Sequence, residues 1–192
     1  MSHALQSEIL TLDDYLEGER DVDIRSEYID GQVYAMAGAS EVHNTISTTF
    51  ASLIDGVLPD ECRVWQSDMK VVGKYQGKEF SYYPDIMASC EENTGDPYYR
   101  TNPCLIIEVL SPSTERIDLQ EKFNSYTHIP SLLEYVIVSQ DTPFLRLYRR
   151  RTHWKAESFY ADEIVDLESI NLQIQVKKIY RRVQREVGLV AR

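Results

Sequence analysis

The sequence predicts an α/β fold in which a mixed central β-sheet is flanked by α-helices. Three observations lead to this prediction. The run CLIIEVL at 104–110 is typical of a strand buried on both faces. A helix-spaced stretch at 115–126 and a second apolar run at 133–139 follow it, in the order of a β-α-β crossover. Earlier in the chain, an Asp-Gly pair between short apolar segments indicates an antiparallel hairpin.

The size of the chain predicts one domain over residues 1–192. With 43% hydrophobic residues it can bury one substantial core. Thr11, three residues before Asp14, predicts a short capped helix at the start. Asp30-Gly31 then joins two strands and places Glu27 in the middle of the first strand.

The middle of the chain predicts a longer helix and a second antiparallel pair. Ser40 can cap a helix that ends before Pro59. Its apolar face carries His43, Ile46, Phe50, Leu53 and Val57. Residues 62–72 and 80–89 are expected to pair as antiparallel strands around a turn with two glycines.

The remaining elements follow the buried strand. A polar loop at 91–103 precedes it, and Ile129-Pro130 ends the helix after it. FLRLYRRR and WKAESFY alternate as a further hairpin, and VKKIYRRVQREV is expected to form a basic, amphipathic C-terminal helix.

Charge is distributed unevenly. The formal net charge is -11, with 9 Lys and Arg against 25 Asp and Glu in residues 1–144, and 11 against 6 in residues 145–192. The overall field therefore opposes nucleic-acid binding, although the basic C-terminal region could contribute to it. Two solvated faces of opposite sign would explain the same asymmetry.

Three widely spaced cysteines, Cys62, Cys90 and Cys104, lack the Cys-x-x-Cys pairing of a zinc site or redox dithiol. We therefore expect a reducing, cytoplasmic location. The N-terminus resembles no export signal, and no long apolar run predicts a membrane span. The absence of a P-loop or Gly-x-Gly-x-x-Gly motif gives no indication of a nucleotide cofactor.

Two acids stand within or at the end of apolar strands, Asp85 in YYPDIM and Glu108 in CLIIEVL. An unpaired carboxylate removed from water costs several kcal/mol, so each acid must be paired, protonated or bound to a metal. Proteins typically hold Mg²⁺ with one or two carboxylates, so Mg²⁺ is a candidate for the cation that these acids bind. A helix cap or a cross-sheet arginine would explain either acid alone.

Together these segments resemble the PD-(D/E)XK nuclease superfamily, and within it the Uma-type restriction endonuclease family. The resemblance runs from about Thr11 to Val183 and rests on SEYIDGQVYAMAG, the His43 helix, YYPDIM, IIEVLSPST and DLQEKFNSY. It implies a restriction-endonuclease-like core. It also implies that Asp85 and Glu108 bind the metal, Mg²⁺ with Mn²⁺ as substitute, and that Glu27 joins the same cluster.

The resemblance departs from the superfamily pattern at the lysine. That residue usually stands two positions after the second acid, where this chain has Leu110. Lys122 on the following helix is the replacement candidate, and we expect it to point toward Glu108. A salt bridge with Asp118 is the alternative role for Lys122.

Several other polar residues are expected to have roles outside the metal site or are weaker candidates for it. His43 is expected to be a hydrogen-bonded core or groove histidine, and His128 and His153 complete no histidine cluster. Ser111, Ser113 and Thr114 fit a helix start better than a nucleophile. Gln66 and Asp68 are weaker site candidates.

The expected reaction is metal-dependent hydrolysis of DNA phosphodiester bonds by an endonuclease, in which the cation activates a water and polarises the phosphoryl oxygen. Arg149, Arg150, Arg151 and the basic C-terminal helix, or else a partner chain, are expected to help DNA approach the acids. A homodimer follows by analogy with enzymes that cut both strands. The alternative is a catalytically inactive nuclease-fold module that binds nucleic acid or a protein, and a metal-dependent hydrolase of small phosphoesters is a third possibility.

Overall fold

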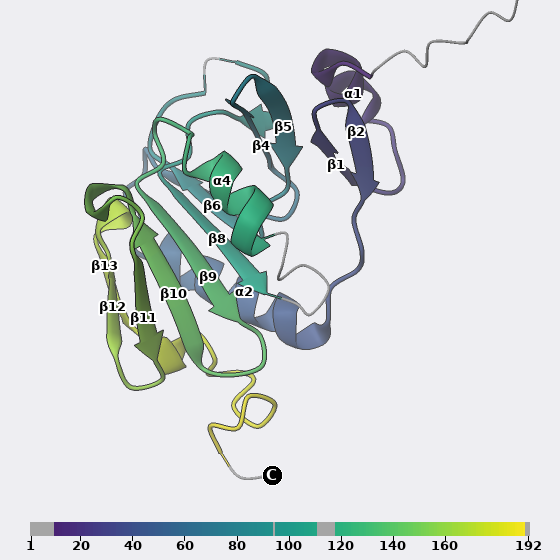
Figure 1. Cartoon of the computed structure of the whole chain (residues 1–192). Coiled ribbons are helices and arrows are strands. Elements are labelled where there is room, and N and C mark those ends of the chain that lie inside the picture. Colours follow the sequence, from purple (N-terminus) through teal and green to yellow (C-terminus); the bar gives the residue numbers. More distant parts are fainter. Residues whose placement is uncertain (1–9, 94, 111–117, 191–192) are drawn as a thin grey trace, which may run out of the picture.

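A computed structural model describes residues 10–93, 95–110 and 118–190 of the chain. Its strands form a six-stranded sheet, a five-stranded sheet and a separate two-stranded ribbon (Figure 1). The predicted α/β fold with mixed pairing is confirmed, but the described strands divide among several sheets instead of one central sheet.

The six-stranded sheet is the larger layer and has the order β11-β10-β9-β8-β6-β3. Only β8 and β9 run parallel, which confirms the predicted crossover between them. Its strands are β3 (Arg63–Gln66), β6 (Ile86–Ser89), β8 (Leu105–Leu110), β9 (Glu134–Ser139), β10 (Phe144–Arg149) and β11 (Ala156–Tyr160).

The five-stranded sheet has the order β2-β1-β5-β4-β7. The predicted hairpin is present, and Asp30 and Gly31 both have positive φ, as a tight two-residue turn requires. The strands are β1 (Ser26–Ile29), β2 (Gln32–Ala35), β4 (Lys70–Tyr75), β5 (Lys78–Tyr82) and β7 (Tyr99–Arg100).

Helices cover both faces of the six-stranded sheet (Figure 1). The predicted caps are confirmed, because Thr11 accepts from the Asp14 amide and Ser40 accepts from the His43 amide. On one face, α2 (Glu41–Asp55) packs Ile46, Phe50 and Ile54 against β6 and β8. On the other face lie η1 (Asp118–Lys122), a π-helical turn, and α4 (Phe123–Tyr126). The first helix, α1 (Leu12–Gly18), packs on the five-stranded sheet.

The expected pairing of 62–72 with 80–89 is wrong in one respect. The chain breaks each segment into two strands, and the inner pair, β4 and β5, belongs to the five-stranded sheet. The outer pair, β3 and β6, belongs to the six-stranded sheet. Ser67, with φ 39°, and Pro84 stand at the two crossing points, where regular strand geometry ends. Asp85 therefore lies where the chain passes from one sheet to the other.

The expected C-terminal helix is also wrong. The 3₁₀ turn η4 (Val176–Lys178) continues into turns closed mainly by bonds three residues apart. The Tyr180 hydroxyl anchors this segment by donating toward the Ser139 and Phe144 carbonyls, at 2.8 and 2.9 Å. The apolar residues still face the core. The ribbon of β12 (Ile164–Leu167) and β13 (Leu172–Gln175), which the sequence patterns had not indicated, precedes this segment. The 3₁₀ turns η2 (Arg150–Thr152) and η3 (Glu168–Ile170) complete the described elements.

Two of the three cysteines form a disulfide. Cys62 and Cys90 lie just beyond the paired ends of β3 and β6, and their sulfur atoms are bonded. The absence of a Cys-x-x-Cys spacing therefore did not mean unpaired thiols, because the antiparallel register brings together cysteines 28 residues apart. Cys104 keeps its thiol. In the described residues, no helix is both long and apolar enough to cross a membrane.

Candidate active site

The site forms on the face of β8 that looks toward the five-stranded sheet. Alternate β8 residues point to opposite faces, so Ile107 and Val109 pack toward α2 while Ile106 and Glu108 point to the other side. Glu108 is only 2% exposed, and its carboxylate must therefore be satisfied inside the protein. Its Oε1 accepts a hydrogen bond of 2.8 Å from the Tyr126 hydroxyl.

Asp85 lies beside Glu108 because β6 and β8 are hydrogen-bonded neighbours. Its amide donates to Glu108 Oε2 at 3.2 Å, and its own Oδ2 accepts from the Val109 amide at 2.7 Å. His43 Nε2, from the first turns of α2, lies 3.1 Å from the same Oδ2. Within the part of the chain that the structure describes, Asp85 Oδ1 accepts no hydrogen bond.

Glu27 reaches the site from the other sheet. It occupies β1, and its Oε1 accepts from the Tyr83 amide at 3.3 Å. The Lys122 ammonium lies 2.9 Å from Glu27 Oε1 and 3.4 Å from Glu108 Oε1, so it links two acids from different sheets. The expected orientation of Lys122 toward Glu108 is therefore found, and the structure brings Glu27, Asp85 and Glu108 into one connected cluster.

Burial controls the electrostatics of this cluster. The side chain of Lys122 is only 8% exposed, and its ammonium also lies 5.5 Å from the centre of the Tyr82 ring. Burial raises the pKa of Tyr82 to about 12. Burial and the neighbouring Glu108 carboxylate raise the pKa of Tyr126 well above its usual value, so this hydroxyl remains a donor to Glu108.

The donor atoms suit a hard divalent cation. Asp85 and Glu108 offer carboxylate oxygens at one place, with Asp85 Oδ1 uncommitted. Mg²⁺ prefers such oxygens and keeps several waters, so two carboxylates satisfy its needs on the protein side. Across residues 10–93, 95–110 and 118–190, no three His, Cys, Asp or Glu side chains stand ready as a metal-binding group. A role for all three acids as metal ligands stays a prediction.

The weaker sequence candidates lie elsewhere or outside the described residues. Asp68 is exposed and pairs with Arg25, while Gln66 lies in β3 opposite Ile86. His128 packs at a tilted angle against the Tyr75 ring. The helix-start candidates Ser111, Ser113 and Thr114 and the side chain of Asp118 lie outside the described part of the chain.

The expected use of Arg149 to approach DNA is wrong, because this residue is buried, whereas the same expectation for Arg150 and Arg151 stays a prediction. Arg149 is 4% exposed and binds Glu134 at 3.1 Å and Glu157 at 2.5 Å. Arg150 donates to the carbonyls of residues 129 and 132, and Arg151 pairs with Glu168. Arg149 is opposite Glu134, at the start of β9, whereas Glu108 is opposite Ile137 farther along that strand. Arg149 and Arg151 thus hold β12 and η3 to the six-stranded sheet.

Sequence reasoning gave no role in the site to Tyr126 and did not identify the partner of His43, although both residues contact the acids. Tyr126 follows Lys122 by four residues, and that spacing places both side chains on one face of a helix, which was the available signal. The sequence patterns predicted a hydrogen bond for His43 but gave no sign that its partner is Asp85, 42 residues away.

The mixed sheets and the buried cluster of acids and lysine define a restriction-endonuclease-like α/β protein. Residues 12–177 match the model of the Uma2 family, described as "Putative restriction endonuclease". The chain belongs to this family, as the sequence resemblance had implied.

Relatives with similar sequence occur in a cyanobacterium. The uncharacterized protein slr1290 of Synechocystis is 35% identical over 179 residues, covering 90% of this chain and 92% of its own. The uncharacterized protein sll1609 of the same organism is 35% identical over 138 residues, covering 70% and 77%.

A solved structure shares the fold. A crystal structure described as "a putative nuclease belonging to DUF820", from Anabaena variabilis, matches with a TM-score of 0.71 at 20% identity. The match covers 89% of this chain and 97% of that one. At this identity the likeness establishes the arrangement of the elements, which agrees with the restriction-endonuclease-like core expected from the sequence.

Proposed function

We propose that this protein is a divalent-cation-dependent endonuclease that hydrolyses DNA phosphodiester bonds. The observation that carries the proposal is the buried Lys122 ammonium, 3.4 Å from Glu108, whose other oxygen accepts from the Asp85 amide. A cation and two acids from neighbouring strands in one site supply charges that phosphodiester hydrolysis uses. Family membership and the solved relative's description as a nuclease support the same reaction.

Asp85 and Glu108 are assigned as the residues that would hold Mg²⁺, or Mn²⁺ in its place. A bound cation would supply Lewis acidity toward a phosphoryl oxygen and the attacking water. Glu27 completes the acid cluster, and its Oε1 is already committed to Lys122 and the Tyr83 amide.

The other residues of the site act on charge and orientation. The Lys122 ammonium would offset negative charge that builds on the phosphoryl group and orient a water for in-line attack. Tyr126 donates to Glu108 and limits the directions that its carboxylate can take. His43 holds Asp85 Oδ2 in the same way, so we assign both as positioning residues.

The test is a nicking assay on supercoiled plasmid and on single-stranded DNA, with and without Mg²⁺ or Mn²⁺. We expect cleavage that requires the cation, stops with EDTA and is lost in Glu108→Gln. Equal cleavage by wild type and Glu108→Gln would overturn the assignment. Cation binding without cleavage would favour the inactive binding module. Measurement of mass in solution tests the homodimer that cleavage of both strands would require.

A further inference from the structure

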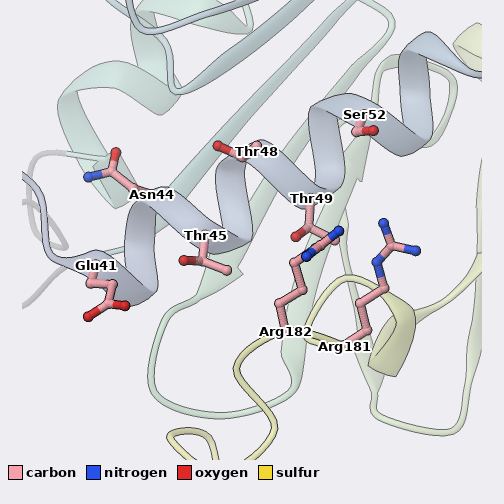
Figure 2. Close-up of a pocket in the computed structure, with 8 residues that line it drawn as sticks. All are labelled: Glu41, Asn44, Thr45, Thr48, Thr49, Ser52, Arg181 and Arg182. Carbon is pink, nitrogen blue, oxygen red and sulfur yellow. The ribbon is translucent and has the colours of Figure 1, made fainter.

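A shallow polar groove of about 510 Å³ lies along α2, away from the acids (Figure 2). One wall is the outward face of α2, and the other is formed by Arg181 and Arg182 of the C-terminal segment. Every residue that lines it is polar or charged. Such a surface suits a ligand that accepts many hydrogen bonds and carries negative charge.

The outward face of α2 has an unusual composition for an exposed helix. The exposed residues at its two ends, Glu41 and Asp55, are charged, but the exposed positions between them, Asn44, Thr48 and Ser52, are all uncharged. Threonine, serine and asparagine are weaker helix formers than the lysine or glutamate usual at such positions. Local stability therefore does not explain these residues. Short hydroxyl and amide side chains let a ligand approach the helix closely and donate hydrogen bonds to it.

Thr49 gives an independent indication of a ligand. Its side chain projects from α2 on the side of Arg182 (Figure 2), and the residue is only 2% exposed. Within the described residues its hydroxyl has no hydrogen-bond partner. A buried hydroxyl without a partner is costly, and this one lines the groove.

The two arginines of the groove differ from arginines elsewhere in the protein that bind acids or carbonyls of the chain. Arg181 and Arg182 are exposed, and within the described part of the chain neither side chain has an ion pair or hydrogen bond. Their guanidinium groups are the cations of the groove, and planar guanidinium forks match phosphate oxygens. Glu41 stands at the far end of the groove, so an anion would bind nearest the arginines (Figure 2).

We propose that this groove binds the phosphodiester backbone of a nucleic acid. The inference rests on the proposed function and adds where the substrate is held. Helix α2 connects the two places, because His43 on its inner face contacts Asp85 while its outer face lines the groove. The uncharged lining from Asn44 to Ser52 extends about 12 Å, at 1.5 Å per helical residue, which is enough for successive phosphates of one strand.

The first experiment measures binding of a labelled duplex and of the matching single strand in EDTA, where no cation-dependent cleavage occurs. In Arg181→Ala/Arg182→Ala we expect about tenfold weaker binding or more, and a salt slope shallower by up to about 1.8 for duplex DNA. The matched control is Lys78→Ala/Lys155→Ala, which removes the same charge from two exposed positions outside the groove and should bind nearly as the parent does.

A second comparison keeps the fold and changes only the charge of one residue that lines the groove. Thr48→Glu and Thr48→Gln both place good helix formers at an exposed position, so both should fold. Thr48→Glu should bind the duplex more weakly than Thr48→Gln, because only the carboxylate repels phosphate.

The outcomes separate this inference from the proposed function. The proposal that the groove binds nucleic acid would be overturned if the double arginine variant kept the affinity and salt slope of the parent. It would also be overturned if the parent bound no nucleic acid. Loss of self-association in that variant without loss of DNA binding would mean that a second copy occupies it. If nucleic acid binds through the groove but no preparation cleaves it, the binding role of the groove would stand and the proposed endonuclease activity would be rejected.

Discussion

The Lys122 ammonium lies 2.9 Å from Glu27, joining the π-helical turn after β8 to the first hairpin of the other sheet. The family resemblance had led us to expect that Lys122 turns toward Glu108, which it also contacts. Its contact with Glu27 makes it the shared cation of two acids that are 81 positions apart in the chain. Substitution of Lys122 should therefore affect both chemistry and the charge balance of the site.

Lys122→Met should lower the rate of DNA cleavage by about 10² to 10⁴, because methionine keeps an apolar stem but removes the positive charge. Cation binding should persist, measured as the melting shift with Mn²⁺, since Asp85 and Glu108 remain. Lys122→Arg is the control that preserves charge. A Met variant that cuts plasmid within about threefold of the parent would exclude this role.

Asp85→Asn should fold at least as well as the parent without metal, since the amide oxygen can still accept from Val109 and the site loses one negative charge. It should lose most of the melting shift that Mn²⁺ produces. At 100 times Kd, a cation stabilises its site by about 2.7 kcal/mol. Asp68→Asn, an exposed acid outside the cluster, is the matched control. Equal shifts in parent and Asp85→Asn would contradict the assignment.

Arg149→Met should destabilise the fold by about 3 to 5 kcal/mol, because it leaves the buried Glu134 carboxylate without its cation. Arg151→Met should cost much less, since its pair with Glu168 is exposed to water. Urea unfolding measures both. We expect Arg149→Met to leave the salt slope of DNA binding unchanged. A stable Arg149→Met protein that fails to bind DNA would restore Arg149 as a DNA contact.

Stability should fall as the pH rises above 10. Burial raises the pKa of Tyr82 from 10.0 to about 12, so the unfolded chain releases this proton first. The resulting stabilisation is complete below pH 10 and is lost as the pH rises toward 12. Tyr82→Phe should reduce the slope of unfolding free energy in that window by up to about 1.4 kcal/mol per pH unit. An unchanged slope in denaturant titrations would show that Tyr82 ionises normally.

The sequence predicted the elements whose signals are local. The Asp30-Gly31 turn, the Ser40 cap and the apolar β8 run each depend on neighbouring residues, and all three are found. The division of residues 62–90 between two sheets was not predictable in this way, because it depends on which distant strands compete for pairing. The disulfide between Cys62 and Cys90 follows from that same register.

The site residues that belong to sequence motifs could be predicted. The contacts that these residues make with other parts of the chain were harder to predict. Asp85, Glu108, Glu27 and Lys122 were named from sequence resemblance, and the fold brings them together. The C-terminal segment was expected to be helical because its apolar spacing fits a helix. The Tyr180 anchor and the 3₁₀ turns place the same residues against the core in a different backbone form.

The crossing at Tyr83-Pro84-Asp85 makes the acid cluster a property of the assembled molecule. Glu27 belongs to one sheet, Glu108 belongs to the other, and Asp85 stands at the passage between them. A nascent or partly digested chain that has formed only one sheet lacks the complete set of acids, whichever sheet it is. The charge cluster therefore forms only when the two sheets pack against each other, and it is lost when they separate.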